Sequence, residues 1–307
     1  MTKLTFNISV ALVLLFCCSM LQILNAQGCS DAGLCTIDAL RPAASSTEMQ
    51  KSSKVSAGIS VGGADYGITA VGGSLGYSGR FTERWSLDSK VTFLSQSGND
   101  IGVAGPGDVF LNINYAVSQK FMLTAGTKIP LTKSNKKFDG VALPMDYQSS
   151  LGTFDVLAGI KYNTLKWQWA LGVQVPLKQN ENAFFPQLYD TTSLVSTIHA
   201  TNGFHRQADI LLHVSRVFEM SDKITFTPGL LPIYHISEDT YTDMDGIVKN
   251  IDGSNGLTLN GTVFIDIELD AASTLEFSLG FPFIVRDARP DGLTRSFVFG
   301  AGYSAQF

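Results

Sequence analysis

Hydrophobic and polar residues alternate along most of the chain beyond about residue 54. The alternation is clearest in residues 83–97, 107–117, 166–178 and 255–269. In the second of these stretches, one face carries Val109, Leu111 and Ile113, and the opposite face carries Asp108 and Asn112. Side chains of a strand point alternately to its two sides, so this pattern predicts β-strands with one apolar and one polar face. A water-soluble β-sandwich shows the same alternation, which therefore does not by itself distinguish a sandwich from a membrane barrel.

The connections between the predicted strands separate these two architectures. Strands are predicted near residues 54–62, 68–80, 83–97, 107–117, 119–130, 152–164, 166–178, 203–218, 222–236, 255–269, 273–285 and 292–307. Every second connection is very short, such as "TE", "SDK" and "AAS", whereas the others include segments such as "TKSNKKFDGVALPMDYQSS". Bacterial outer-membrane barrels combine an even strand number with short periplasmic turns and long extracellular loops. The predicted fold is therefore all-β, a transmembrane antiparallel up-and-down β-barrel of about 12 strands, whose closure pairs every strand edge.

Aromatic residues gather near the short-turn ends of the predicted strands. On the apolar face they are Trp85, Tyr115, Phe121, Tyr162, Trp167, Trp169, Phe218, Tyr303 and Phe307. This placement is typical of the aromatic girdle at a membrane interface. The last strand, "FVFGAGYSAQF", resembles the C-terminal signal of outer-membrane barrels, which implies that the barrel assembly machinery reads Tyr303 and Phe307.

The N-terminus is typical of a secretory signal peptide. Lys3 precedes the apolar run "ISVALVLLFCCSMLQIL", and a small residue precedes the expected cleavage after Ala26. A transmembrane anchor is disfavoured because polar residues begin directly after residue 24, and a lipoprotein cleaved before Cys29 would need a large aliphatic residue at Ala26. The predicted segments are a signal peptide at 1–26, a periplasmic leader or lumen plug at 27–53, and the barrel at 54–307. The expected location is the outer membrane of a Gram-negative cell.

Export also determines which cysteines remain. Cys17 and Cys18 leave with the signal peptide, and Cys29 and Cys35 remain in "QGCSDAGLC". In an oxidising compartment Cys29 and Cys35 are candidates for a disulfide that closes a small loop, and two free thiols are an open alternative.

Composition removes other classes of function. A formal net charge of −5 without a basic stripe excludes a nucleic-acid-binding protein. No apolar run of 18 residues follows the signal peptide, which excludes ordinary transmembrane helices. Mean hydropathy is +0.14, and only 16% of the residues are charged. This composition is more apolar than is usual for a secreted soluble protein, and it fits a barrel whose outer surface faces lipid.

Four strands share a weak repeat that ends near a proline. The prolines are Pro130, Pro176, Pro228 and Pro282. Proline cannot donate a hydrogen bond to a β-ladder, so these positions predict bulges, kinks or strand ends. The alternative is that they open gaps in the barrel wall near the outer leaflet.

Two stretches carry a resemblance to a known family. "GPGDVFLNINYAVSQKFMLTAGTKIPL" and "LPMDYQSSLGTFDVLAGIKYNTLKWQWALGVQVPL" resemble outer-membrane transporter-like barrels of the phenol-degradation MetA-pathway group, distant relatives of fatty-acid and toluene transporters of the FadL type. The shared pattern includes Gly105, Gly107, Asp108, Lys128, Pro130, Gly152, Asp155 and a "W-x-W" hairpin. The resemblance implies uptake of small, often hydrophobic compounds. The chain departs from the FadL type in its smaller strand number and in having no evident helical hatch.

Inward-facing positions of the predicted strands are candidates for contact with a solute. They include Asp88, Lys90, Phe110, Met122, Asp155, Lys161, His205, Asp209, Leu211, His213, Phe264 and Asp266. Their charges suit water, a polar solute or a mutually neutralising network, whereas apolar neighbours such as Leu94 and Leu157 suit an apolar pocket. Most inward charges are expected to be paired, because isolated charges in a narrow lumen are costly.

Catalytic and metal sites are disfavoured. His213 and Ser215 share one side of a strand, superficially like outer-membrane phospholipase A, but they fall on the lumen face and not on the lipid face that such chemistry requires. His205 and Asp209 would lie about 13 Å apart along a strand and need further ligands to bind a metal. The acidic residues Asp239, Asp243, Asp245 and Asp252 miss the EF-hand spacing, which favours a solvated acidic loop over a calcium site. No catalytic residue, cofactor or metal is predicted.

The sequence thus predicts a non-enzymatic outer-membrane channel or transporter for uptake of a small solute. The family resemblance implies that this solute is hydrophobic or aromatic. Its expected partners are outer-membrane lipid, the assembly machinery and the solute. The alternative is a non-transporting surface barrel whose extracellular loops bind a partner and whose lumen is plugged. A lipid hydrolase is a distant third.

Overall fold

A computed structural model of the chain describes residues 53–292 and 296–307. The barrel wall is built from β1 (Ser53–Gly63), β2 (Thr69–Arg80), β3 (Trp85–Gly98), β4 (Ile101–Ala116), β5 (Phe121–Pro130), β8 (Phe154–Asn163), β9 (Trp167–Lys178), β10 (Asp209–Arg216), β11 (Phe218–Ser221), β12 (Ile224–His235), β15 (Gly256–Asp270), β16 (Ser273–Ile284) and β17 (Phe297–Gln306). Small hairpins outside the wall are β6 (Lys137–Phe138) with β7 (Val141–Ala142), and β13 (Thr240–Thr242) with β14 (Val248–Asn250). Because β10 and β11 form one wall strand interrupted at Val217, the wall has the twelve strands predicted.

The wall is a closed antiparallel barrel. Consecutive wall strands are hydrogen-bonded neighbours, and the first strand, β1, pairs with the last strand, β17. Both parts of the interrupted strand, β10 and β11, pair with β12. Every wall strand therefore has two partners, which satisfies the backbone groups that lipid cannot satisfy. Across the described ranges, no helix combines the length and apolar character needed to cross a membrane.

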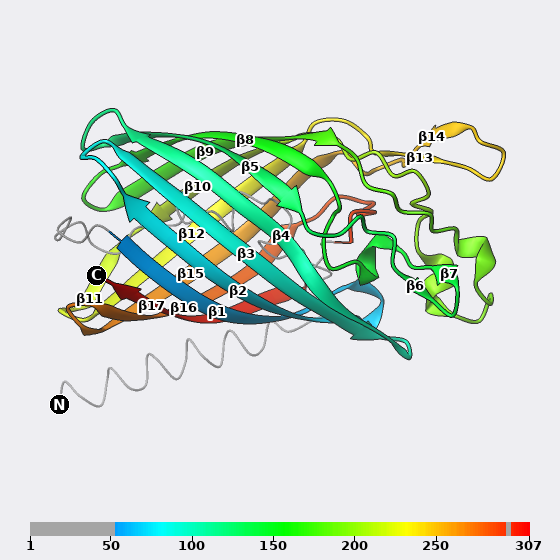
Figure 1. The fold of residues 1–307 in the computed structure, drawn as a ribbon, viewed down its shortest axis with the longest axis horizontal. Coiled ribbons are helices and arrows are strands. Elements are labelled where there is room, and N and C mark those ends of the chain that lie inside the picture. Colours follow the sequence, from blue (N-terminus) through cyan, green and yellow to red (C-terminus); the bar gives the residue numbers. More distant parts are fainter. Residues whose placement is uncertain (1–52, 293–295) are drawn as a thin grey trace.

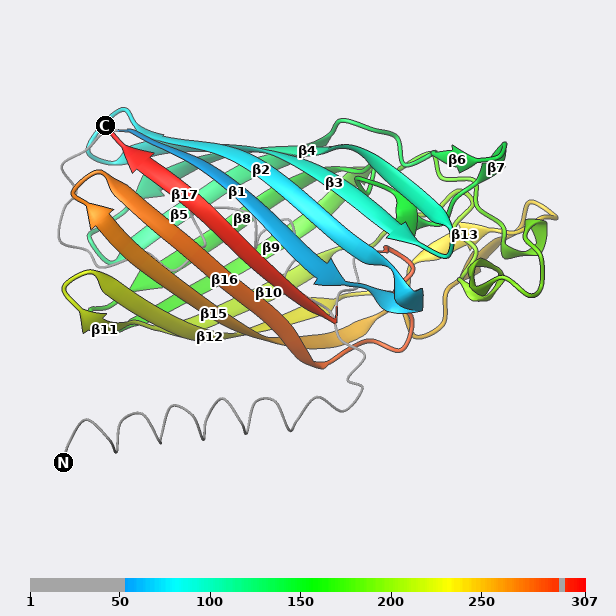
Figure 2. The ribbon, with the colours of Figure 1, turned by 90° about the horizontal axis from the view of Figure 1, so that it is seen from below.

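The two ends of the barrel differ (Figure 1, Figure 2). At one end, here called the short-turn end, strands are joined by turns of a few residues, and Ser53 and Phe307 exchange backbone hydrogen bonds of 3.2 and 3.0 Å. The opposite, long-loop end carries the β6–β7 and β13–β14 hairpins (Figure 1). This is the division of turns and loops that the sequence predicts.

The outer face of the barrel is apolar. Ile59 is 70% exposed, whereas the next residue, Ser60, points into the lumen and lines its cavity. Aromatic residues pair on this face near the short-turn end: Trp85 with Tyr115, Phe121 with Tyr162, and Trp167 with Trp169, with ring centroids 4.7, 4.6 and 6.3 Å apart. These pairs form the predicted aromatic girdle.

Two strand starts differ from the prediction by six residues. Strand β4 begins at Ile101, earlier than residue 107, and β10 begins at Asp209, later than residue 203. Residues 203–208 instead join the long loops, where His205 is exposed and pairs with Thr240 through backbone hydrogen bonds of 2.9 and 3.1 Å. The prediction that His205 faces the lumen is therefore wrong. Alternation alone does not show where a strand gives way to a loop.

The four prolines occupy strand ends, register shifts and one regular position. Pro130 is the last residue of β5, and shifts in pairing lie beside Pro176 and Pro282. Pro228 stays in register with Val263 of β15. The predicted signal peptide, the leader, and the pair Cys29 and Cys35 lie outside the described residues.

Candidate lumen passage

One side of the lumen is lined by very small residues. On the inward faces of β1, β2, β16 and β17 they are Ser56, Gly58, Ser60, Gly62, Ala70, Gly72, Ser74, Ser278, Gly280, Gly300 and Gly302. Side chains of this size leave the space beside these strands unfilled. We call this surface the small-residue wall.

The opposite side of the lumen is filled by larger polar side chains. Buried examples from β8, β9, β10, β12 and β15 are Asp155, Lys161, Gln168, Gln174, Asp209, His213, Thr225, Thr227, Asn260 and Asp266. Lys128 and Asp155 form a 2.8 Å ion pair with side chains only 2% and 0% exposed, and Lys128 also donates to Thr153 Oγ1 at 2.9 Å. Pairing of this kind is what buried charges require.

A cavity of about 330 Å³ lies between these two sides. The small-residue wall forms one side of the cavity, and Lys90, Asp108, Phe110, Lys128 and Phe264 are among the residues that face it. Its volume is at the lower end of the range of small-molecule sites, about 300–1,000 Å³. This cavity therefore lies off-centre in the barrel, beside β1, β2, β16 and β17.

Residues 142–153, here called the inward loop, are buried from end to end. Ser149 donates to the carbonyl of Pro106 at 2.8 Å, and Ser150 donates to Asp108 Oδ1 at 2.6 Å. Gln148, Ser149, Ser150 and Leu151 also line the cavity. The inward loop thus enters the mouth of the barrel from the long-loop end and covers the cavity there.

Apolar packing holds the inward loop in place. Leu143 and Tyr147 pack in a cluster with Ile68, Ile101 and Phe184. A second cluster joins two further members of the inward loop to other long loops: Met145 and Leu151 with Phe204, Ile251 and Ala288. The Tyr147 hydroxyl donates to the carbonyl of Gly98 at 2.9 Å, and burial raises the pKa of Tyr147, so the hydroxyl keeps its proton at neutral pH.

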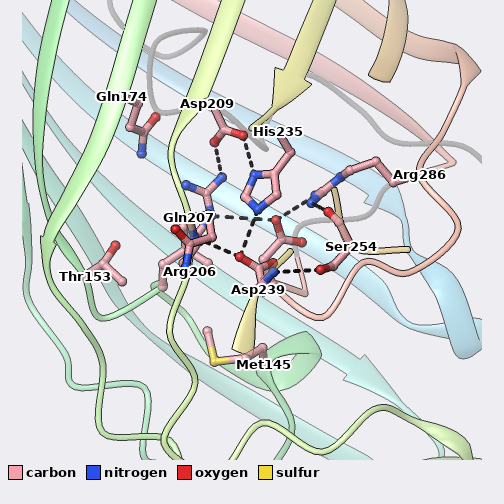
Figure 3. Close-up of polar contacts among 12 residues, drawn as sticks. Met145, Thr153, Gln174, Arg206, Gln207, Asp209, His235, Asp239, Ser254 and Arg286 are labelled. Carbon is pink, nitrogen blue, oxygen red and sulfur yellow. Dashed lines mark hydrogen bonds and ion pairs between the residues drawn. The ribbon is translucent and has the colours of Figure 1, made fainter. Parts of the chain in front are cut away.

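A buried group of charges lies beside the inward loop (Figure 3). Its members, here called the charge cluster, are Arg206, Asp209, His235, Asp239, Arg286 and Asp291. His235 contacts Asp209 through Nδ1 at 2.6 Å and Asp239 through Nε2 at 2.9 Å, an arrangement that a doubly protonated ring satisfies, since carboxylates only accept. The charge cluster ties the ends of β10 and β12 to three long loops.

The two arginines of the charge cluster act on the loop carboxylate Asp291. Arg286 lies 3.0 Å and Arg206 3.7 Å from Asp291 Oδ2. Burial alone raises the pKa of Asp291, but the two guanidinium charges outweigh it and hold the pKa below its usual value. Burial likewise opposes the charge of Arg206, and Asp209 and Asp291 reverse that effect and raise its pKa. These loops are therefore joined by charges that stabilise one another.

The structure places most predicted lumen residues inside the barrel. Lys90, Phe110 and Phe264 line the cavity. Others pack into the lumen as buried side chains: Asp88, Asp155, Lys161, Asp209, Leu211, His213 and Asp266. Met122 is half-buried on the inward face of β5, between exposed outward neighbours. His205 alone among the predicted set lies outside the lumen.

The arrangement around His213 is not that of a nucleophilic dyad. Its Nε2 lies 3.0 Å from Thr262 Oγ1, and its ring meets Phe264 edge-on. The Ser215 hydroxyl is buried and has no hydrogen-bond partner among the described residues. Both side chains are therefore parts of the lumen packing.

The acidic residues of the β13–β14 region do not converge. Asp239 belongs to the charge cluster, whereas Asp243 accepts from the backbone of Asp245 and Ile247 and pairs with Lys249 at 2.7 Å. Within the part of the chain that the structure describes, no group of three or more His, Cys, Asp or Glu side chains is placed to hold a metal ion.

The residues that sequence reasoning missed are those of the inward loop and of the charge cluster outside the strands. Arg206, Arg286 and Asp291 come from loops, where alternation has no predictive value, and Asp239 was identified only as one of the acidic residues of its loop. The glycine and serine content of "SAGISVGG" in β1, "GGSLGYSG" in β2 and "GAGYS" in β17 was an available signal of the small-residue wall.

Solved structures share this fold. The COG4313 outer membrane channel from Pseudomonas putida F1 has a TM-score of 0.60 at 15% sequence identity, with 87% of this chain and 99% of that chain covered. The translocator domain of the autotransporter NalP from Neisseria meningitidis has a TM-score of 0.47 at 10% identity, with 88% and 91% covered, and the CymD monoaromatic hydrocarbon channel has 0.44 at 10%, with 93% and 95% covered. No family model and no curated protein matches the sequence. The chain thus has the fold of outer-membrane β-barrels.

Proposed function

We propose that the chain is an outer-membrane channel that takes up a small solute through the off-centre passage beside the small-residue wall. The observation that carries this proposal is the cavity itself, which extends along the inward faces of β1, β2, β16 and β17, where wall side chains are small. The structurally similar channel from Pseudomonas putida supports the proposal through its fold.

The lining favours a solute with both apolar and hydrogen-bonding parts. Phe110, Phe264 and Leu94 supply apolar surface, and Ser60, Ser74 and Ser278 are among the hydroxyls that line the same cavity. Small aromatic compounds with a hydroxyl group have this character. Pockets of this kind use apolar surface for affinity and a few polar groups for orientation.

Uptake by liposomes containing the full mature chain tests the proposal. Hydroxylated monoaromatics should enter faster than into empty liposomes, and a charged disaccharide of larger volume should not. Equal entry of the aromatic solute into liposomes with and without the protein would refute the channel.

A second candidate is a surface barrel that binds a partner through its loops. The tip of the β13–β14 hairpin exposes Met244, Ile247 and Val248 beyond the barrel mouth (Figure 1). Exposed apolar groups of this kind are typical of interaction sites. Deletion of residues 243–247 should then abolish cell-surface binding of the partner and leave solute uptake unchanged.

A further inference from the structure

The short turns of the barrel share one backbone arrangement. In each, the last residue of the turn accepts a backbone hydrogen bond from the neighbouring strand: Arg84 from Ala116, Lys120 from Asn163, Lys166 from Val217 and Lys223 from Glu268, all at 2.8 Å, and Ala272 from Gln306 at 2.7 Å. Four of the five turns therefore place a basic residue at the same structural position.

At three of these turns an aromatic residue follows the cation directly. Trp85, Phe121 and Trp167 begin β3, β5 and β9 on the outer face of the barrel, and each is a member of an aromatic pair of the girdle. Because aromatic girdles lie at the level of the lipid headgroups, the preceding cation lies at the water-facing edge of that level.

Around Trp167 the arrangement includes a second cation. Arg216 lies directly opposite Trp167 in the β9–β10 pairing. Its guanidinium carbon is 5.4 Å from the centroid of the Trp167 ring and 4.9 Å from that of Phe218. Strand alternation turns Arg216 outward, since its neighbour Ser215 is buried on the lumen side.

Arg216 and Lys166 carry the positive charges of this arrangement. Among the described residues, neither side chain has a carboxylate within ion-pair distance. The turn at Lys166, "TL", contains no acidic residue, and the alternation that turns Phe218 outward turns Glu219 away from Arg216. An outward arginine is costly in hydrocarbon and is tolerated near the interface, where phosphate groups lie.

We propose that Arg216, held against Trp167 and Phe218, binds the phosphate of an anionic phospholipid in the leaflet at the short-turn end, with Lys166 in the adjoining turn adding a second positive charge. The Trp167 and Phe218 rings hold the guanidinium by cation–π contact, which leaves its N–H edge for the phosphate oxygens. Two positive charges complement a lipid of net negative charge better than a zwitterionic one. The site belongs to the outer face, so it is independent of solute passage through the lumen.

Native mass spectrometry of the intact mature chain tests the site, with phosphatidylglycerol and phosphatidylcholine as competing probes. The unaltered chain should retain phosphatidylglycerol preferentially. The double variant Arg216→Gln with Lys166→Gln should lose about thirtyfold in affinity for it, since each basic residue near an anionic surface contributes a factor of about five. Arg216→Lys should lose less, because the charge remains while the bidentate geometry is lost.

The matched control is Lys249→Gln with Lys133→Gln, which changes net charge equally at the long-loop end, where both lysines are exposed. This control should bind phosphatidylglycerol as the unaltered chain does. Heat-modifiable electrophoretic mobility shows that each variant is a folded barrel. Undiminished binding by the folded double variant, or an equal loss in the control pair, would overturn the proposal.

Discussion

The hydroxyl of Ser150 donates a hydrogen bond to Oδ1 of Asp108 at 2.6 Å, which joins the inward loop to strand β4 at the edge of the lumen cavity. Ser149 adds a second bond to the same strand at Pro106. These two bonds therefore hold the inward loop against β4, where the loop covers the cavity.

Replacing Ser150 by alanine should loosen this closure. The change removes the hydroxyl donor of a largely buried carboxylate and should weaken the attachment of the loop by about 1–3 kcal/mol. Single-channel recording should show more frequent or larger openings. Ser196→Ala is the control, because the Ser196 hydroxyl donates within an outer loop, to the carbonyl of Ser193. Identical conductance of Ser150→Ala and Ser196→Ala would show that this bond does not hold the loop.

Substitution of Gly292 should be tolerated less well than substitution of Gly246. Gly292 has φ +66°, and a Cβ there would collide with the backbone of Met145 and Asp146 in the inward loop, whereas Gly246 has φ +78° and open space around it. Gly246→Ala should therefore cost only the left-handed backbone penalty, about 1–2 kcal/mol. Gly292→Ala should in addition displace the inward loop. Hydrogen exchange of residues 142–153 should accelerate in Gly292→Ala and not in Gly246→Ala; equal protection in both would contradict this contact.

Removing one member of the buried ion pair of Lys128 and Asp155 should destabilise the barrel strongly, whereas replacing both members by apolar residues should destabilise it little. Lys128→Met leaves the Asp155 carboxylate buried without its cation and should destabilise the barrel by about 3–5 kcal/mol. The double variant Lys128→Met with Asp155→Leu should recover most of this loss, because neither member of the pair is left without its partner. The temperature at which folded electrophoretic mobility disappears measures both effects. A single variant as stable as the unaltered chain would mean that water already screens the pair.

Acid should loosen the long loops through Asp291. Its pKa is lower in the folded protein than the ordinary aspartate value of about 3.9, so its stabilising contribution is complete above that value and is lost as pH falls through the folded pKa. The near-ultraviolet circular dichroism of the buried tyrosines should diminish over this acid range. Asp291→Asn should already show a weakened signal near neutral pH and a flatter acid profile. Asp245→Asn, on the exposed β13–β14 hairpin, should follow the unaltered chain; an identical profile for Asp291→Asn would exclude this role.

The barrel wall could be predicted because its strands alternate regularly. The long loops at the mouth of the barrel could not be predicted, because they show no such pattern. The period of two assigns Ser60 to the lumen and Ile59 to the lipid face, and the structure confirms such assignments through most strands. The same rule placed His205 in the lumen because it could not detect that β10 begins only at Asp209. Arg206 and Asp291 are 85 residues apart by number, and only the folded loops bring them together.

The off-centre position of the cavity likewise could not be predicted from the sequence. Which strands stand beside the cavity depends on the packing of long polar side chains from the opposite wall, such as Gln174 and Asp266. The alternation of strand positions identifies the inward-facing candidates, but it does not show that Lys90, Phe110 and Phe264 line this cavity and that Leu211 does not.

The most direct test of the central claim is solute flux through liposomes carrying Ser60→Phe or Ile59→Phe. These neighbouring positions of β1 receive the same side chain, one on the small-residue wall and the other on the lipid face. If solute passes beside the small-residue wall, Ser60→Phe should fill the passage and abolish most of the flux, while Ile59→Phe should retain it, with both barrels folded. Flux that survives unchanged in Ser60→Phe would contradict a passage beside the small-residue wall.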